Sequence, residues 1–178
     1  DLTADFRRRF HRRRALQRGA RLHPFSLPSF GFVKKPMGMT WEVSGDAEVS
    51  GPARIGEPYV FHTGKTGLVL DSPGLSFHAL SVKKAVLEMR LPERAYLPPG
   101  MGRGCLRWRQ KENEHFYPTD RFCFDLKPDG EVHVYELVLE DDVHWAMSNA
   151  INRLRLEPVY YETGVELFRL EFLPPEKE

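Results

Sequence analysis

The sequence has few cysteines and no long hydrophobic run. Cys105 and Cys123 are its only cysteines, and two cysteines cannot build a disulfide framework or a four-ligand zinc site on their own. The longest apolar runs are four residues or fewer, far short of the roughly 20 that cross a bilayer. No apolar core of a secretory signal is visible. With 41% hydrophobic and 29% charged residues, the composition excludes collagen-like, low-complexity and fully disordered chains.

A catalytic constellation is also missing from the sequence. None of the seven histidines belongs to an H-E-x-x-H or H-x-H pair, and no carboxylate pair stands out for glycosidase chemistry. The run Gly64-Lys65-Thr66 resembles the end of a phosphate-binding loop, but the upstream glycine is not at the required spacing. We interpret the acidic run Glu140-Asp141-Asp142 as solvated rather than cation-binding. We therefore expect that the protein is not an enzyme and that it binds neither a cofactor nor a metal ion.

Positive charge is concentrated at the N-terminal end. The net charge is +1, yet residues 1–22 contain eight of the 26 lysines and arginines. This segment is rich in good helix formers and predicts a helix over roughly 3–18, with Asp1 or Thr3 as the N-cap and Gly19 ending the helix. Its clustered guanidinium groups repel one another unless an anion screens them. The candidate anion contacts are Arg7, Arg8, Arg9, Arg12, Arg13 and Arg14.

Two interpretations of this basic arm stay open. It contacts nucleic acid backbone or anionic lipid through phosphate groups, or it is a solvated helix end. We also expect a partner protein or a neighbouring domain to be reached through residues 1–40, and a cytoplasmic or membrane-associated location. Residues 23–40 contain three prolines and predict an extended linker, because proline is excluded from helix interiors and central strands.

From Trp41 to residue 174 the sequence is typical of an all-β domain. Short β-branched and aromatic segments alternate with turn signals at about ten-residue spacing, which indicates a two-sheet antiparallel β-sandwich. Pro128-Asp129-Gly130 lies between two alternating runs and predicts a hairpin. Residues 144–150 predict a helical turn, and residues 175–178 a tail. The expected strands are 41–44, 58–62, 67–71, 82–91, 104–110, 120–127, 131–139, 151–157 and 164–173.

The period-two pattern of these strands assigns side chains to two faces. One face is apolar and predicts the core: Leu87, Met89, Leu106, Trp108, Phe122, Phe124, Tyr135, Leu137, Leu154 and Leu156. His133 is expected on the core side as a structural histidine. The other face is charged and combines arginines with Glu88, Asp125 and Glu157, which predicts a ladder of opposite charges. Cys105 and Cys123 fall on this outward face, either bridged or as two free thiols.

Residues 67–173 resemble a known family. The segments "GLVLDSPGLSF", "AVLEMRLP", "CLRWRQ", "RFCFDLKPDGEVHVYELVL", "INRLRLEP" and "GVELFRLEF" are similar to a bacterial galactose-binding-like jelly roll that resembles carbohydrate-binding modules. Such modules are found beside glycosyltransferase, glycosidase and other cell-surface polysaccharide domains. The resemblance implies a jelly-roll fold and a glycan as ligand, and it leaves out the basic arm.

The favoured function is a non-catalytic carbohydrate-binding or accessory module, part of a larger polysaccharide-synthesis or cell-surface protein. Arginine and carboxylate groups on the charged face can form hydrogen bonds with sugar hydroxyls. Aromatic rings in loops, among them Phe116, Tyr117 and Tyr161, can stack on sugar rings. The predicted ligand-binding residues are Arg107, Arg109, Arg121, Asp125, Arg155, Trp145 and Tyr160. The alternative is a structural subunit of a large assembly whose arm contacts nucleic acid, anionic lipid or a partner chain.

Overall fold

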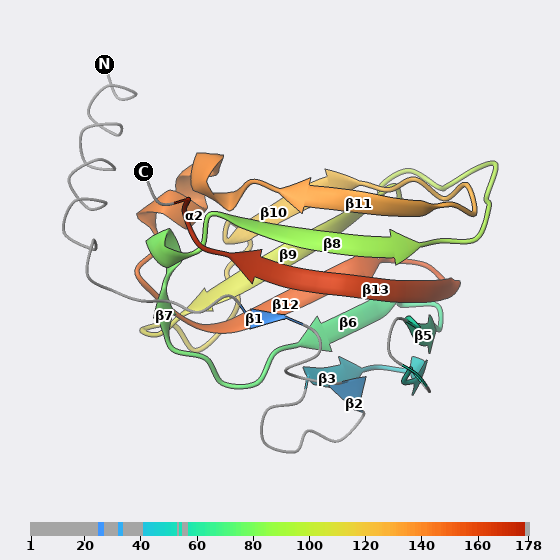
Figure 1. The fold of residues 1–178 in the computed structure, drawn as a ribbon, viewed down its shortest axis with the longest axis horizontal. Helices are drawn as coiled ribbons and strands as arrows, with labels where there is room; N and C mark the ends of the chain where they lie inside the picture. Colours follow the sequence, from blue (N-terminus) through green and yellow to red (C-terminus); the bar gives the residue numbers. More distant parts are fainter. Residues whose placement is uncertain (1–24, 27–31, 34–40, 53, 55–56, 177–178) are drawn as a thin grey trace.

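Two β-sheets packed face to face make up most of the described part of the chain (Figure 1). The computed structural model describes residues 25–26, 32–33, 41–52, 54 and 57–176. Sheet A has the order β11 (Val132–Leu137), β8 (Lys84–Arg90), β13 (Gly164–Leu173), β5 (Tyr59–His62) and β4 (Glu48–Ser50), with β1 (Phe25–Ser26) paired to β13. Sheet B has the order β10 (Arg121–Asp125), β9 (Arg103–Gln110), β12 (Ala150–Val159), β6 (Leu68–Asp71), β3 (Trp41–Ser44) and β2 (Phe32–Val33), with β7 (Phe77–His78) paired to β12.

The chain passes repeatedly between the two sheets. Strands β8, β11 and β13 belong to sheet A, whereas β9, β10 and β12 belong to sheet B. All strand pairs are antiparallel except β2 with β3, which is parallel. The expected all-β, two-sheet sandwich is confirmed. The N-terminal helix expected over 3–18 lies outside the described residues and stays a prediction.

Every expected strand is present, with bounds shifted by a few residues at most. The expected helical turn is α2 (Val143–Met147), preceded by the 3₁₀ turn η3 (Leu139–Asp141), and a second 3₁₀ turn, η2 (Ala79–Ser81), follows β7. The short strands β4 and β7 were not expected, because two or three residues are too few to show a period. β1 and β2 fall within the predicted linker, so this segment contributes backbone pairs to both sheets.

The hairpin expected at Pro128-Asp129-Gly130 is wrong. Its flanking strands do not pair with each other: β10 pairs with β9 in sheet B, and β11 pairs with β8 in sheet A. The turn itself forms as expected, with Gly130 at a φ of 83° and the Glu131 N–H donating to Asp129 Oδ1 at 3.0 Å. A turn signal determines where the chain reverses but not which strand becomes its partner.

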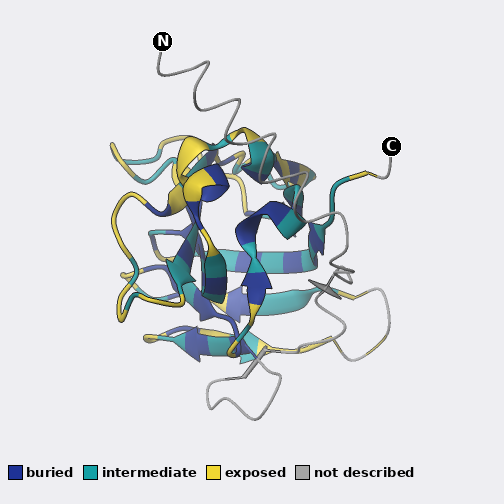
Figure 2. Cartoon of the chain, turned by 90° about the vertical axis from the view of Figure 1, so that its left-hand side faces the viewer, coloured by how far each residue is buried: buried dark blue, intermediate teal, exposed yellow. Residues whose placement is uncertain are grey.

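Buried residues of both sheets form one hydrophobic core, and Figure 2 marks buried positions in dark blue along the strands. Trp108 and Trp145 are fully buried and meet edge to face with ring centroids 5.0 Å apart, the arrangement that aromatic quadrupoles favour. The Trp108 indole N–H donates to Ser148 Oγ at 2.9 Å. At the other end of the core, Phe124 of β10 packs 5.2 Å from Tyr135 of β11. The ten predicted core residues are buried except Phe122, which is half-buried and packs against the core.

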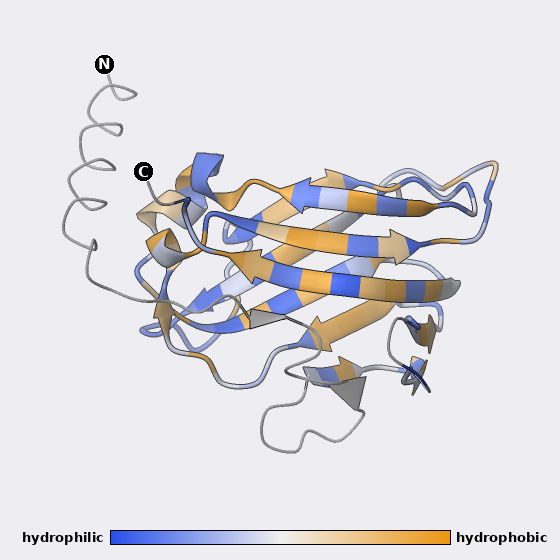
Figure 3. Ribbon diagram, viewed as in Figure 1, coloured by the Kyte–Doolittle hydropathy of each residue, from blue (hydrophilic) through white to orange (hydrophobic). Residues whose placement is uncertain are grey.

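The outer face of sheet A carries cross-strand ion pairs beside the exposed Val132 and Val134 of β11. Hydropathy alternates along much of β11 and β13 (Figure 3), as a strand with one solvated face requires. Arg90 pairs with Glu166 directly opposite on β13, and Arg169 lies opposite Glu88, 3.5 Å away. His133 is half-buried rather than in the core, and its Nε2 lies 2.8 Å from Asp129. The hydrogen bond from the Glu131 N–H, and then this contact with His133, lower the pKa of Asp129.

Candidate ligand-binding face

The outer face of sheet B carries an unusual density of arginines. Because side chains alternate along a strand, the residues between the buried Leu106, Trp108, Leu154 and Leu156 point away from the core. We call this surface the arginine face. It consists of Arg103, Arg107, Arg109, Arg121, Arg153 and Arg155, together with the carboxylates Glu42, Asp71, Asp125 and Glu157.

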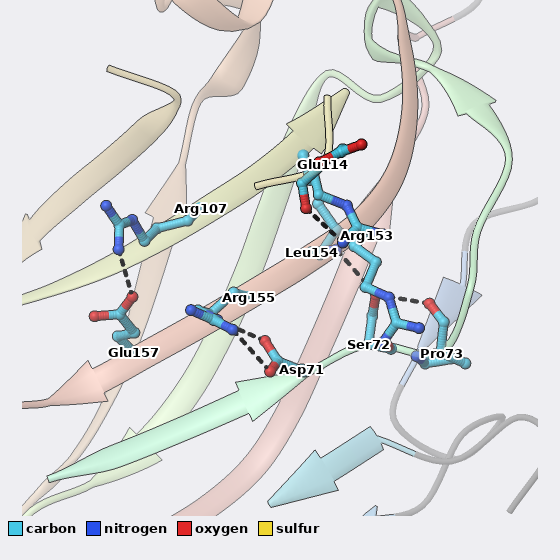
Figure 4. A network of polar contacts seen from close by, with 10 residues as sticks. Asp71, Ser72, Pro73, Arg107, Glu114, Arg153, Leu154, Arg155 and Glu157 are labelled. Carbon is cyan, nitrogen blue, oxygen red and sulfur yellow. Dashed lines mark hydrogen bonds and ion pairs between the residues drawn. The ribbon is translucent and has the colours of Figure 1, made fainter. Parts of the chain in front are cut away.

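Three of the arginines on this face pair with carboxylates. Arg155 holds Asp71 through two hydrogen bonds, Nε to Oδ1 at 2.7 Å and Nη2 to Oδ2 at 3.0 Å (Figure 4). Arg107 Nη1 lies 3.3 Å from Glu157 Oε1, and Arg103 Nε lies 3.1 Å from Asp125 Oδ1. The Asp71 and Glu157 side chains are only 12% and 10% exposed, so their arginine partners shield them from solvent.

The register places like charges opposite one another. Arg107 lies directly across from Arg121 on β10 and from Arg155 on β12. Arg109 lies directly across from Arg153. The row through Arg107 continues over β6 and β3, where Arg155 meets Asp71 directly across and Asp71 lies opposite Glu42. Like charges directly opposite destabilise a sheet. The ladder of opposite charges expected from the sequence is therefore present only in part: Arg155 pairs with Asp71, whereas three arginines lie side by side.

The expected ladder is also divided between two surfaces. Glu88 and Arg90 lie on sheet A, where opposite charges do face one another, whereas Asp125 and Glu157 lie on sheet B. The period-two pattern reports which side chains share a face of one strand. It carries no information on which strands share a sheet.

Arg109, Arg121 and Arg153 have no carboxylate within ion-pair distance among the described residues. Arg109 Nε donates to Asn152 Oδ1 at 2.9 Å, and Arg153 Nη1 donates to the Ser72 carbonyl at 3.3 Å (Figure 4). These acceptors are neutral, so they orient the guanidinium groups without cancelling their charge. Arg121 is exposed at the edge strand β10.

Aromatic side chains lie on the arginine face. The loop that joins β9 to β10 places the ring of Phe116 4.3 Å from Arg155 Cζ and 5.9 Å from Arg109 Cζ, a cation–π geometry. Tyr160 follows β12 and donates a hydrogen bond to Glu157. Burial, and then this bond, raise the pKa of the Tyr160 phenol, so that it stays protonated. Neighbouring contacts thus position both rings of this face, Phe116 and Tyr160.

The structure corrects the expected role of Trp145. This residue has no exposed surface, and its indole N–H donates to the Val82 carbonyl at 3.2 Å. Trp145 is therefore a core residue and does not meet a ligand. Tyr161 is also buried, whereas Tyr117 is exposed. The six other predicted ligand residues all lie on or beside the arginine face, as follows: Arg107, Arg109, Arg121, Asp125, Arg155 and Tyr160.

Neither the predicted ligand residues nor the predicted charge ladder included four members of this face: Arg103, Arg153, Asp71 and Glu42. Asp71 follows the inward Leu68 and Leu70 of β6, so its outward direction was available from the alternation. Its role as the partner of Arg155 was not, because 84 residues separate the two in the chain.

Cys105 and Cys123 form a disulfide that joins β9 to β10, where the two residues are direct partners in the ladder. This settles the choice between a bridge and free thiols. The bridge lies on the arginine face between the rows of Arg103 and Arg107.

Other candidate sites have little support in the described part of the chain. No group of three histidine, cysteine or acidic residues there could hold a metal ion. The acidic run 140–142 instead has structural contacts: Asp142 Oδ1 accepts the Trp145 N–H at the start of α2, and Glu140 pairs with Lys83. No helix described is both long and apolar enough to span a bilayer. The six candidate anion contacts of the arm lie among residues 1–24, outside the described residues.

No protein-family model matches the chain, and no curated protein matches it. Among solved structures, it is similar to the low affinity xylan binding module CBM86 from Roseburia intestinalis, with 11% identity, 86% of this chain and 95% of that chain covered, and a TM-score of 0.48. A family 11 carbohydrate-binding module of the Clostridium thermocellum cellulase Lic26A-Cel5E has 9% identity, with 91% and 94% covered and a TM-score of 0.45.

A glycoside hydrolase domain, Endo-D from Streptococcus pneumoniae R6, is similar over 79% of this chain and 22% of that chain, with 14% identity and a TM-score of 0.47. Modules of the kind that the sequence resembles are therefore among the structures to which this chain is similar. The two-sheet fold rests on the strand pairing given above, and the chemistry of a ligand is argued below from the arginine face.

Proposed function

We propose that this chain is a non-catalytic carbohydrate-binding or accessory module that binds glycan on the arginine face. One observation carries the proposal: a single sheet surface presents oriented guanidinium groups, carboxylates and two aromatic rings side by side. Guanidinium and carboxylate groups form charge-assisted hydrogen bonds, and hydroxyl groups of a sugar can both accept from the first and donate to the second.

The strands give this surface the rigidity that recognition requires. Arg155 is held by Asp71 at its edge and by Phe116 over its plane, so little side-chain entropy remains to be lost when a ligand binds. Pre-organisation of this kind strengthens binding, because ordering a long side chain costs about 0.5–1.5 kcal/mol.

We propose further that the module belongs to a larger polysaccharide-synthesis or cell-surface protein. The disulfide between Cys105 and Cys123 supports a cell-surface setting, because disulfides persist in oxidising compartments and are rare in the cytosol. It favours that setting over the cytoplasmic location expected from the sequence.

The test is a glycan array probed with the full chain, followed by calorimetric titration of each hit. Tyr160→Ala should weaken binding about three- to tenfold, the contribution of one aromatic contact. Tyr96→Ala is the matched control, since Tyr96 is 71% exposed and lies in the loop after β8 rather than on a strand of sheet B. A folded protein that binds no glycan on the array or in titration contradicts the proposal.

A further inference from the structure

We infer that the ligand of the arginine face is an acidic glycan whose sugar units carry carboxylate groups. This inference rests on the proposed function and names the class of glycan. It starts from a contrast between the two outer faces. On sheet A, charged residues directly across from each other have opposite sign, as with Arg90 and Glu166 or Glu88 and Arg169. Sheet B has opposite pairs as well, Arg155 with Asp71 and Arg103 with Asp125, but its register also sets arginine across from arginine three times.

Arginines placed opposite each other reduce stability unless an anion lies between them. A cross-strand pair contributes about 0.2–1 kcal/mol when its charges are opposite, and like charges destabilise. The ion pairs with Glu157 and Asp71 reduce the repulsion between Arg107 and Arg155. Arg109 and Arg153, also direct partners, have only neutral acceptors within hydrogen-bond distance.

Among the described residues, two positive positions on the arginine face therefore have no carboxylate partner. One is the Arg109–Arg153 pair, and the other is Arg121, at the edge of the row that continues with Arg107 and Arg155. Neighbouring strands lie about 4.8 Å apart, so a carboxylate above either position is within reach of a guanidinium fork. Arginine matches the planar geometry of a carboxylate through two parallel hydrogen bonds.

The carboxylates of the same face favour a ligand that carries hydrogen-bond donors beside its negative charges. Asp71, Asp125 and Glu157 lie beside the arginines, with Glu42 beyond Asp71. A nucleic acid, with a phosphate at every unit, would meet these groups with repulsion. A sugar unit that carries a carboxylate also carries hydroxyls, which can donate to Asp71 or Glu157 while its carboxylate meets arginine.

Calorimetry on the full chain tests this inference with a panel of uronate oligosaccharides and the same oligosaccharides after methyl esterification. Esterification removes the charge and keeps the hydroxyls. We expect at least one acid form to bind about tenfold more tightly than its ester, with affinity falling as salt rises. Equal affinity for acid and ester overturns the inference and leaves the proposed function intact. Binding of no acidic or neutral glycan by the folded chain overturns both.

Paired variants locate the site. Arg109→Gln with Arg153→Gln should weaken the acid form about tenfold or more and leave the ester little changed. Arg90→Gln with Lys84→Gln is the matched control, because it removes the same charge from sheet A, and it should change neither affinity. Equal loss in both double variants overturns the inference, since it would reflect net charge alone. Tighter binding of single-stranded DNA or a sulfated glycan than of every uronate also overturns it.

A second variant separates geometry from charge. Arg109→Lys keeps the positive charge but loses the planar fork and the hydrogen bond from Nε to Asn152. We expect a loss of affinity for the acid form that is smaller than in the glutamine variant. Both Arg109→Lys and the double variant Arg109→Gln, Arg153→Gln could keep full affinity and wild-type melting curves. That result would show that this pair does not contact the ligand, and it would overturn the inference.

Discussion

Truncating Trp108 tests whether the core of the sandwich is packed as described. The side chain has no exposed surface, contacts Trp145 edge to face at 5.0 Å, and donates its indole N–H to Ser148 Oγ at 2.9 Å. Replacing a buried tryptophan with alanine removes its transfer free energy and leaves a cavity, which together cost about 3–5 kcal/mol. The lost aromatic contact and hydrogen bond place Trp108→Ala at the upper end, about 4–5 kcal/mol.

This loss is a large share of the total for a domain, since folded proteins are stable by about 5–15 kcal/mol. In a chain of this size 1 kcal/mol corresponds to about 2–4 °C in Tm, so we expect Trp108→Ala to melt about 10–15 °C lower. Guanidinium denaturation followed by far-UV circular dichroism measures the free energy of unfolding directly.

Two variants make the result interpretable. Tyr117→Ala truncates an aromatic residue that is 49% exposed, and it should stay within about 0.5 kcal/mol of the parent. Ser148→Ala leaves the indole N–H of Trp108 buried without its acceptor, which should cost about 1–3 kcal/mol. A loss below about 1 kcal/mol in Trp108→Ala would refute the packing of the two tryptophans between the sheets.

The remaining predictions concern single groups. The free energy of unfolding of Tyr161→Phe should equal that of the parent or exceed it by up to about 1 kcal/mol, because the buried Tyr161 hydroxyl has no hydrogen-bond partner among the described residues; a clear loss in denaturant melts would contradict this. Arg90 lowers the pKa of Glu166 below its usual value of 4.5. The Arg90–Glu166 pair therefore stabilises the folded state above that pH, and this stabilisation is lost as the pH falls through the lower pKa of the folded state. Tm should therefore fall less steeply below pH 5 in Glu166→Gln than in the parent, and parallel pH curves would refute the pairing. Reducing the Cys105–Cys123 bridge, whose partners lie 18 residues apart, should cost about 3 kcal/mol; unchanged denaturation midpoints in protein with two titratable thiols would disprove that.

Much of the fold was predictable because alternation is a local property. The inward positions of Leu106 and Trp108, and the outward positions of Arg107 and Arg109, follow from the two-residue period of a strand. The same reasoning failed for Trp145, whose five-residue helix is too short to show an amphipathic period. That residue was expected in a loop and is instead one of the most deeply buried in the core.

Strand pairing could not be predicted from the sequence. Pro128-Asp129-Gly130 determined a reversal of the chain, and the alternating strands determined which side chains avoid water, because both depend on residues a few positions apart. Only the tertiary structure decided that β10 and β11 enter different sheets and that Arg109 faces Arg153 rather than a carboxylate. Register joins residues tens of positions apart and depends on how two sheets bury their apolar faces together, so the arginine face exists only in the folded chain.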